Sequence, residues 1–426
     1  MTTPAPESLI GEAEARGELL ADLQWEHLEL KNSLLKAVRV KGFAKPTIIQ
    51  AKALGIILAS NENFIGQAKN GSGKTAAFSL AALSKVDERE ARCQALIIAP
   101  ARELAQQNLD VLRDLGQFTE VKVELGCPPL QSPPRAHIIS GTPGKIEDWL
   151  RRGALDGSAI KIVVLDEADT MLDGADSNSM AATMMKIVKK CPNAQRLLFS
   201  ATFPKRVRAF SQSIAPNAHR ATLKKTDLKV SSLCQLWSSL SSDNYGAKNE
   251  AVSSVFNLLT AGQGIVFCNT IRGADQLANF MKQQGFSVTL LVGRNVSPSE
   301  RDERMKEFRN KTTTILVTTD VLARGIDVPA VNLVVNYDMP VLYENGQRTD
   351  QAATETYLHR VGRAGRMGRR GFSLSFIANP EEKLLLEQVA QEYDLPIHEI
   401  PSDYMQLREL LRTLERENGT GEGGQD

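Results

Sequence analysis

The sequence lacks the features that mark zinc-binding, disulfide-bonded, membrane-spanning and secreted proteins. Its 426 residues include only five cysteines, and no two of these lie close together: Cys93, Cys127, Cys191, Cys234 and Cys268. That spacing excludes a zinc knuckle and a disulfide framework, and it is typical of a reducing compartment. No apolar run approaches the roughly 20 residues of a membrane span, and the N-terminus lacks a signal-peptide pattern. We therefore expect an intracellular protein with no membrane partner.

Charge of either sign is not in excess, since 51 basic residues face 50 acidic ones. The whole chain therefore gives no electrostatic argument for a nucleic-acid partner, and any such argument must be local. Hydrophobic residues make up 42% of the chain and charged residues 24%, as in globular proteins. Because 426 residues exceed what one ordinary core holds, two domains are predicted.

Short apolar runs alternate with amphipathic stretches in two successive series. The predicted strands are at residues 95–99, 162–165 and 196–199 in the first series, and at residues 264–267, 288–292, 314–317, 333–335 and 373–377 in the second. The predicted helices include residues 102–118, 180–190, 272–284 and 300–310. Such alternation is typical of parallel sheets covered by helices on both faces. The predicted fold class is α/β, with two parallel sheets flanked by helices.

The patterns divide the chain into five segments. They are an acidic N-terminal extension (1–24), a first domain (25–222), a linker (223–232), a second domain (233–416) and a Gly-rich disordered tail (417–426). The linker is the least periodic stretch between the two series. The acidic extension could form an inhibitory helix against basic surfaces, and a solvated tail is the alternative.

A loop between an apolar pair at residues 64–65 and a helix-forming run at residues 76–86 has the pattern of a phosphate-binding loop. It consists of Ala68, Lys69, Asn70, Gly71, Ser72, Gly73, Lys74 and Thr75. Glycines in such a loop let backbone N–H groups face phosphates at a helix N-terminus, while Lys74 reaches the β- and γ-phosphates and Thr75 binds Mg²⁺. Ala68 stands where glycine is usual, and a flexible Gly/Ser loop is the alternative.

Acidic residues follow the predicted strand at residues 162–165, in the order Asp166, Glu167, Ala168, Asp169. The carboxyl ends of parallel strands lie where such sheets bind ligands. Asp166 would hold Mg²⁺ through its water shell, and Glu167 would orient or deprotonate the attacking water. Alone, this run could equally be a helix N-terminus with favourable charges. Together with the phosphate-binding loop, it predicts a Mg-ATP site.

Three arginines in the second half, Arg360, Arg363 and Arg366, have the spacing that places them roughly on one helix face. A solvated basic face is the alternative. Phosphoryl transfer needs positive charge at the γ-phosphate, and the first half shows no arginine for this purpose. We therefore predict that Arg363 and Arg366 reach the ATP from the second domain, so that hydrolysis depends on closure of the cleft between the domains.

In this order and spacing, the motifs resemble the DEAD-box RNA helicases of superfamily 2, from about residue 25 to about residue 415. The resemblance implies two RecA-like domains that bind ATP, Mg²⁺ and single-stranded RNA. It implies nucleotide contacts from Phe43 and Gln50, which would read adenine, and from Gly325 and Asp327. It adds His359 to the catalytic residues, and it implies RNA contacts from Arg102, Thr142, Gly144, Lys145 and Thr318. It also implies that Asp169, Ser200 and Thr202 couple hydrolysis to RNA binding.

An insertion at residues 341–355 and the sequence at residues 401–404 are similar to one branch of this family, which remodels messenger ribonucleoprotein at the nuclear pore during mRNA export. That resemblance implies a nucleoporin and an inositol-phosphate-assisted activator as partners of a monomer. It also implies a protein of cytoplasm and nucleus, enriched at the cytoplasmic face of the pore.

The chain departs from the family pattern around the predicted RNA contacts. Ala101 replaces a usual hydroxyl residue, Lys145 replaces a common arginine, and residues 126–134 are rich in proline. These departures favour a local, nonprocessive remodeller over a processive unwinder. The alternatives are an ATP-gated RNA clamp with little unwinding, a helicase of another RNA process such as translation initiation, and a DNA helicase.

Overall fold

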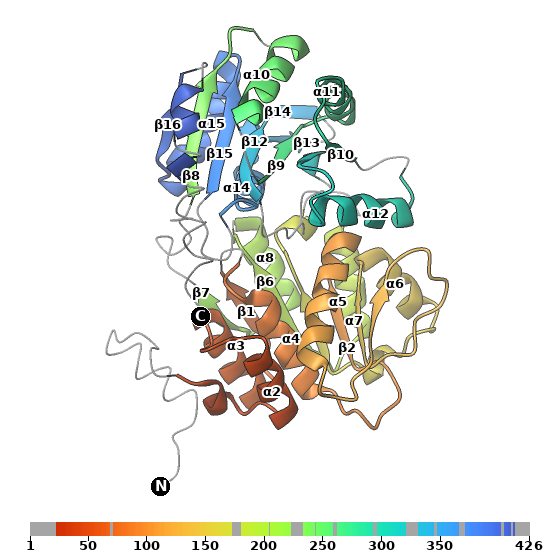
Figure 1. The fold of residues 1–426 in the computed structure, drawn as a ribbon. Helices are drawn as coiled ribbons and strands as arrows, with labels where there is room; N and C mark the ends of the chain where they lie inside the picture. Colours follow the sequence, from red (N-terminus) through yellow and green to blue (C-terminus); the bar gives the residue numbers. More distant parts are fainter. Residues whose placement is uncertain are drawn as a thin grey trace, which may run out of the picture. The chain divides into compact units, whose positions relative to one another are not determined.

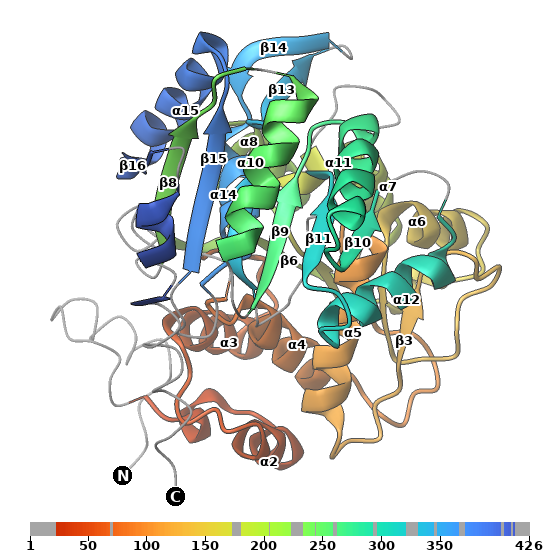
Figure 2. The ribbon, with the colours of Figure 1, turned by 45° about the horizontal axis from the view of Figure 1, so that its top comes forward.

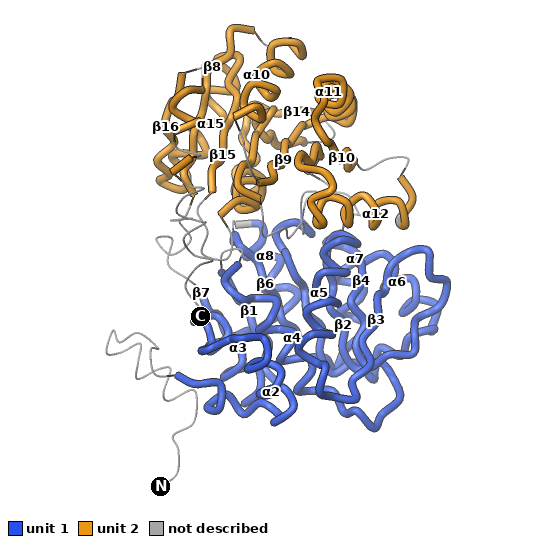
Figure 3. The backbone as a smooth tube through the Cα atoms, in the orientation of Figure 1, with its two compact units in different colours: residues 1–224 blue, residues 225–426 orange. Residues whose placement is uncertain are grey.

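The computed structural model describes residues 23–68, 71–172, 180–203, 205–222, 233–242, 244–258, 262–292, 296–320, 331–344, 347–365, 371–401, 404–409 and 412–413. The chain divides into two compact units, residues 1–224 (unit 1) and 225–426 (unit 2), shown in Figure 3. Nearly all of the expected acidic extension, and all of the expected linker and tail, lie outside the described residues. Within the described ranges, no helix has both the length and the apolar character that a membrane crossing requires.

Unit 1 contains one parallel sheet with the strand order β3-β4-β2-β5-β6-β1-β7, of which β1, β2, β6 and β7 are labelled in Figure 1. Its strands are β1 (Phe64–Gln67), β2 (Ala95–Ile98), β3 (Val123–Gly126), β4 (Ile138–Gly141), β5 (Ile162–Leu165), β6 (Gln195–Ser200) and β7 (His219–Thr222). Its helices are η1 (Trp25–Leu28), α2 (Asn32–Val40), α3 (Ile48–Ala59), α4 (Lys74–Lys85), α5 (Arg102–Gly116), α6 (Pro143–Arg151), η2 (Gly157–Ala159), η3 (Thr170–Leu172), α7 (Met180–Lys190) and α8 (Lys205–Ile214).

Unit 2 contains a second parallel sheet, with the order β10-β11-β9-β12-β15-β8-β16. Its strands are β8 (Leu233–Ser239), β9 (Gln263–Phe267), β10 (Val288–Leu291), β11 (Ile315–Thr318), β12 (Val331–Asn336), β15 (Gly371–Ile377) and β16 (Ile397–Glu399). Its helices are α10 (Tyr245–Leu258), α11 (Ile271–Gln283), α12 (Pro298–Arg309), α14 (Thr354–Val361) and α15 (Pro380–Tyr393). When only the seven strands of each sheet are numbered along the chain, which leaves out β13 and β14 of unit 2, both sheets have the order 3-4-2-5-6-1-7.

Alternate residues of the central strands pack into different hydrophobic clusters. In β5, Ile162 and Val164 belong to one core cluster of unit 1, whereas Val163 and Leu165 belong to another. Because successive side chains of a strand point to opposite faces, the sheet is covered on both sides. This arrangement explains the continuous apolar runs in the sequence, and it confirms the predicted α/β fold with two parallel sheets.

The insertion predicted at residues 341–355 contains a two-stranded antiparallel hairpin (Figure 2). Its strands are β13 (Val341–Glu344) and β14 (Gln347–Ala352). The hairpin packs against α15, where the Gln388 Oε1 accepts a hydrogen bond from the Ala352 N–H at 2.8 Å. The sequence predicted the position of this insertion but not its strands.

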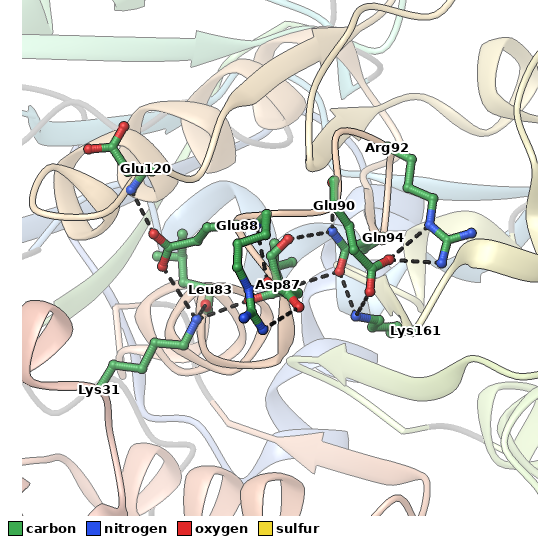
Figure 4. A network of polar contacts seen from close by, with 11 residues as sticks. Lys31, Leu83, Asp87, Glu88, Glu90, Arg92, Gln94, Glu120 and Lys161 are labelled. Carbon is green, nitrogen blue, oxygen red and sulfur yellow. Dashed lines mark hydrogen bonds and ion pairs between the residues drawn. The ribbon is translucent and has the colours of Figure 1, made fainter.

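A polar network holds the loop between α4 and β2 (Figure 4). Gln94 closes this loop, because its Nε2 donates to the Asp87 carbonyl at 2.8 Å and its Oε1 accepts from the Asp87 N–H at 2.9 Å. Lys161 Nζ donates to the same Oε1 at 2.7 Å, and Lys31 Nζ donates to the Val86 carbonyl at 3.0 Å. These contacts anchor the far end of the helix that begins at the predicted phosphate-binding loop.

Candidate active site

The predicted phosphate-binding loop joins β1 to α4 at the carboxyl edge of the unit 1 sheet. Gly71 and Gly73 have φ angles of +78° and +96°, a left-handed conformation that glycine adopts without steric strain. Gly73 is the N-cap residue of α4. The predicted loop residues Lys69 and Asn70 lie outside the described residues.

Lys74 begins α4 and is buried, and its Nζ donates a hydrogen bond to the Ala68 carbonyl at 2.6 Å. Thr75 follows in the first turn and is half-buried, as is Ser72 in the loop. The first N–H groups of a helix have no partner within the helix, and they lie at the positive end of its dipole. The arrangement therefore suits a phosphate group.

Helix α3 supports this loop through two side chains at its own start. Thr47 Oγ1 donates to the Ser72 carbonyl at 2.9 Å, and Gln50 Nε2 donates to the Gly73 carbonyl at 3.3 Å. Gln50 Oε1 also accepts from the Thr47 N–H at 2.8 Å, as part of a capping box. A Cβ atom on Gly73 would lie 2.4 Å from Gln50 Nε2. Sequence reasoning missed Thr47, although the capping box is visible as Thr47 and Gln50 three residues apart.

Phe43, predicted to stack on adenine, lies on the segment before α3 and is 37% exposed. Its ring stacks on Trp25 with 6.5 Å between the ring centroids. Trp25 is buried and its Nε1 donates to the Phe43 carbonyl at 2.8 Å. Both the ring and the backbone of Phe43 are thus held from η1, and part of the ring remains accessible.

Three phenylalanines fix the phosphate-binding loop against the neighbouring strand. Phe64 on β1 and Phe78 on α4 both pack on Phe199 of β6, at centroid distances of 5.7 and 5.5 Å. A Cβ atom on Gly66 of β1 would lie 2.8 Å from the Phe199 ring. Because protein cores are close-packed, this contact sets the position of the strand that leads into the loop.

The acidic run begins where β5 ends, and β5 is paired directly with β6 in the sheet. Asp166 is buried, and both of its carboxylate oxygens have donors: Oδ1 accepts from the Glu167 N–H at 3.0 Å, and Oδ2 accepts from Asn108 Nδ2 at 3.1 Å. Glu167 is also buried and has a φ of +52°, which is strained for a residue with a Cβ. Strain of this kind clusters at functional sites.

Burial raises the pKa of Asp166 to about 7, and the negative charge of Glu167 adds to this effect. The positive charge of Lys74 and the hydrogen bonds from Asn108 and the Glu167 N–H act in the opposite direction. The ionised form of Asp166 is therefore disfavoured at this position, since burial penalises a charged carboxylate. A cation bound at this edge would stabilise that ionised form.

The predicted coupling residues meet in one buried cluster. Asp169 Oδ2 accepts from Thr202 Oγ1 at 2.7 Å and from the Thr202 N–H at 3.2 Å, while Ser200 Oγ accepts from the Asp169 N–H at 3.3 Å. The acidic run after β5 is therefore joined directly to the segment after β6. Gln67 at the end of β1 donates to the Ala201 carbonyl at 3.4 Å, which extends the link to the phosphate-binding loop.

Arg102, a predicted RNA contact, is the first residue of α5, and its Nη1 donates to the Pro128 carbonyl at 2.8 Å. The N-cap position is held by Ala101, which makes no side-chain cap, as its lack of a hydroxyl predicts. The Pro-rich loop is held from the other side, since Trp149 Nε1 and Arg152 Nη2 donate to the Gln131 carbonyl at 3.1 and 2.9 Å. This loop is thus ordered against two helices.

Three further predicted RNA contacts lie together at the start of α6. Thr142 is its N-cap residue, and the Gly144 backbone is open, with no atom within 4 Å of where a Cβ would lie. Lys145 Nζ lies 3.8 Å from Asp148 Oδ2 and 5.5 Å from the centroid of the Trp149 ring. An open backbone at a helix N-terminus suits a backbone phosphate of RNA.

In unit 2, Thr318 lies at the end of β11 and is fully buried, and its Oγ1 donates to the Leu291 carbonyl at 2.7 Å. Its hydroxyl is thus occupied by the neighbouring strand in this structure. The predicted nucleotide contacts Gly325 and Asp327 lie outside the described residues.

The expectation that the arginines share one helix face is wrong, because α14 ends at Val361 with Gly362 as its C-cap residue. Arg360 lies inside the unit and is 1% exposed. Arg363 follows the helix and is also buried, and its Nε donates to the carbonyl of His359, another buried residue. Gly362 lowers helix propensity at this point, which accounts for the break.

Arg360 is bound on several sides within unit 2. Its Nε and Nη2 donate to the two carboxylate oxygens of Asp320 at 2.5 and 2.7 Å. Its Nη1 donates to the Asp338 carbonyl at 2.7 Å, and its Nη2 also donates to Asn269 Oδ1 at 2.8 Å. This arginine joins the ends of three strands. Arg366, the other predicted finger, lies outside the described residues.

Two family descriptions match this chain. The DEAD/DEAH box helicase description covers residues 47–210, and the helicase conserved C-terminal domain covers residues 247–368. The ATP-dependent RNA helicase dbp5 of Schizosaccharomyces pombe is 40% identical over 407 residues, which is 94% of this chain and 79% of the relative. This chain belongs to the DEAD/DEAH box helicases.

Solved helicase structures agree with this assignment. S. cerevisiae Dbp5 bound to RNA and ADP BeF3 matches with a TM-score of 0.85 and 36% identity, over 92% of this chain and 99% of that one. A Dbp5 variant of S. cerevisiae bound to Nup159, a Gle1 variant, IP6 and ADP matches with a TM-score of 0.62 and 34% identity, over 91% of this chain and 100% of that one. The predicted RecA-like architecture and the predicted helicase family are confirmed. All predicted site residues except Phe43 fall within the two matched ranges.

Proposed function

We propose that the chain is an ATP-dependent RNA helicase that hydrolyses ATP at the carboxyl edge of the unit 1 sheet while it binds single-stranded RNA. The observation that carries this proposal is the cluster of Asp166, Glu167, Asp169, Ser200 and Thr202. One run of carboxylates lies beside the phosphate-binding loop, and it is also hydrogen-bonded to the next strand end. A change at these residues can therefore affect both the bound ATP and the bound RNA.

Each nucleotide-binding residue has a proposed task. Phe43 stacks on adenine and Gln50 bonds its edge, residues 68–75 hold the phosphates, and Gly325 and Asp327 reach the nucleotide from unit 2. Lys74 releases the Ala68 carbonyl and moves to the β- and γ-phosphates. Glu167 orients or deprotonates the attacking water, and His359, Arg363 and Arg366 complete the catalytic set from unit 2.

Thr75 and Asp166 would hold Mg²⁺, with most of its ligands supplied by water and phosphate. A hydroxyl and a carboxylate are the hard oxygen ligands that Mg²⁺ prefers. The raised pKa of Asp166, caused chiefly by burial, means that its ionised form is disfavoured, and a divalent cation would stabilise that form. When bound, the ion neutralises charge on the phosphates during transfer.

The RNA would be held by its sugar-phosphate backbone, at the helix starts that carry Arg102, Thr142, Gly144 and Lys145, and at Thr318 of unit 2. Backbone contacts carry little base specificity. Asp169, Ser200 and Thr202 would couple RNA binding to hydrolysis. Because ATP and RNA each favour the closed state, each strengthens binding of the other.

We extend the relatives' partners to this chain. S. cerevisiae Dbp5 has been solved with RNA, and a variant of it with Nup159, Gle1 and IP6. We infer that the chain remodels messenger ribonucleoprotein in mRNA export, as a monomer, with a nucleoporin and an inositol-phosphate-assisted activator. It would be found in cytoplasm and nucleus, enriched at the cytoplasmic face of the pore.

The test is the ATPase rate with single-stranded RNA, with DNA of matched sequence, and with neither. RNA is expected to raise the rate well above both controls, and no RNA dependence at any salt concentration would contradict the proposal. A second candidate, an ATP-gated clamp, is favoured by the Pro-rich loop that holds Arg102. Displacement of short strands and of bound protein separates the two, because a clamp displaces neither.

A further inference from the structure

We infer that Asn108 of α5 is a positioning residue that fixes the carboxylate of Asp166 in the orientation in which it holds Mg²⁺. The inference rests on the proposed function, since it concerns how that site is built. Asn108 belongs to none of the motifs that the sequence singled out. Its role emerges only from a contact between residues 58 positions apart.

The two hydrogen bonds to Asp166 come from different directions. Asn108 Nδ2 approaches Oδ2 from α5, whereas the Glu167 N–H approaches Oδ1 from the adjoining backbone. The carboxylate therefore cannot rotate without breaking one of them. Partners of this kind orient the residues that hold a metal ion, and removing them typically lowers metal affinity about 10- to 100-fold.

The stability of the fold alone does not explain an asparagine at position 108. It is fully buried, and its Oδ1 has no hydrogen-bond partner among the described residues. An unsatisfied buried amide oxygen destabilises a fold, and a leucine of similar size would avoid that penalty. A residue that breaks the local packing rule in this way is expected at a functional site.

The helix that carries Asn108 also carries the proposed RNA contact Arg102, less than two turns earlier. Between them, the Ala105 carbonyl accepts from Ser140 Oγ of β4 at 2.8 Å, which ties the helix to the sheet. One short, rigid element thus joins an RNA contact to the carboxylate that would hold the metal. We therefore expect Asn108 to contribute to the response of the Mg²⁺ site to RNA.

The test uses the full chain with Asn108→Leu and measures binding of a fluorescent ADP analogue as Mg²⁺ is titrated. The Mg²⁺ concentration for half-maximal binding is expected to rise about 10- to 100-fold. The unfolding temperature without nucleotide should be unchanged or higher, and the RNA-stimulated ATPase rate should recover at saturating Mg²⁺. Asn108→Ala, which leaves a cavity, is measured in parallel and should show the same Mg²⁺ shift even if it is less stable.

The matched control is Gln106→Leu on the same helix, because Gln106 donates to Asp110 Oδ1 at the surface at 2.8 Å. It should leave the Mg²⁺ titration unchanged. A wild-type protein whose nucleotide binding ignores Mg²⁺ would overturn the proposed function itself. A normal wild-type response that neither Asn108 variant shifts would overturn only the inference, as would a loss of binding that no Mg²⁺ concentration restores.

Discussion

Each unit has a lysine and a carboxylate at corresponding points of the same topology, but the contacts of the lysine differ between the two units. In unit 1, Lys74 lies on the helix after the first strand and Asp166 follows the fifth strand. In unit 2, Lys248 lies on the helix after the first strand and Asp338 follows the fifth. Lys248 Nζ is 3.1 Å from Asp338 Oδ1 and 3.0 Å from Glu382 Oε1, whereas Lys74 Nζ donates to a backbone carbonyl.

The pKa directions express the same difference. Burial alone would lower the pKa of Lys248, but Asp338 and Glu382 together raise it above its usual value. In unit 1 burial and Glu167 raise the pKa of Asp166. In unit 2 one lysine is thus paired with two carboxylates, whereas in unit 1 burial and a second carboxyl group still disfavour the ionised form of Asp166. The same sheet edge can therefore carry a structural ion cluster in one unit and a ligand site in the other, depending on the charges that surround its carboxylate.

The largest effect on stability is expected in unit 2, from Lys248→Met. Removing the cation leaves the buried Glu382 and the half-buried Asp338 without this partner, and loss of one member of a buried ion pair destabilises a protein by about 3–5 kcal/mol. The free energy of unfolding from urea denaturation measures this loss. Lys306→Met, on the exposed surface of α12, is the control and should change it little. Equal stability of the two variants would show that the cluster is not structural.

In unit 1, Lys74→Met is expected to change catalysis more than stability. Loss of one positive group at the transferred phosphate lowers kcat by about 10²–10³-fold. The lost hydrogen bond to Ala68 contributes about 1 kcal/mol to folding, and Asp166, which also loses the attraction of the Lys74 charge, can become neutral by taking up a proton. Lys85→Met, at the other end of the same helix, is the matched control for ATPase activity. If Lys74→Met instead unfolds the protein while Lys85→Met does not, the contrast between the units fails.

A smaller effect is expected from alanine at the two loop glycines. Both have a positive φ, so either alanine adds strain of about 1–2 kcal/mol. Only Gly73→Ala also meets Gln50, whereas a Cβ on Gly71 meets nothing within 4 Å. Gly73→Ala should therefore weaken ATP binding more than Gly71→Ala in a fluorescent-nucleotide titration. Equal losses would mean that Gln50 does not brace the loop.

The sequence predicted the regular elements well, because their patterns are local. The strand at residues 162–165 and the helix at residues 180–190 coincide with β5 and α7, and the other predicted elements shown by range differ by at most two residues at either end. Five strands of the two sheets were not predicted: β3, β4, β7, β8 and β16. Among these, β3 and β7 have only four residues of mixed polarity. The prediction that three arginines share one helix face was wrong, because it relied on their spacing and not on Gly362, which ends the helix.

Long-range contacts account for what the sequence did not reveal about the site. Gln50 was predicted to read adenine, but its hydrogen bond to the Gly73 carbonyl depends on how α3 packs beside the loop. Likewise, nothing in the pattern around Asn108 indicates Asp166 as its partner. The burial of Arg360 also follows from strand ends that only the fold brings together.

In the proposed mechanism unit 1 supplies most of the contacts to ATP, while hydrolysis also requires arginines of unit 2. Arg363→Ala in the full chain tests it most directly, by measuring ATP-analogue affinity and RNA-stimulated kcat on the same preparation. We expect nearly unchanged affinity and a kcat lower by about 10³-fold or more. An unchanged kcat, or a loss of affinity that accounts for the whole loss of activity, would contradict it.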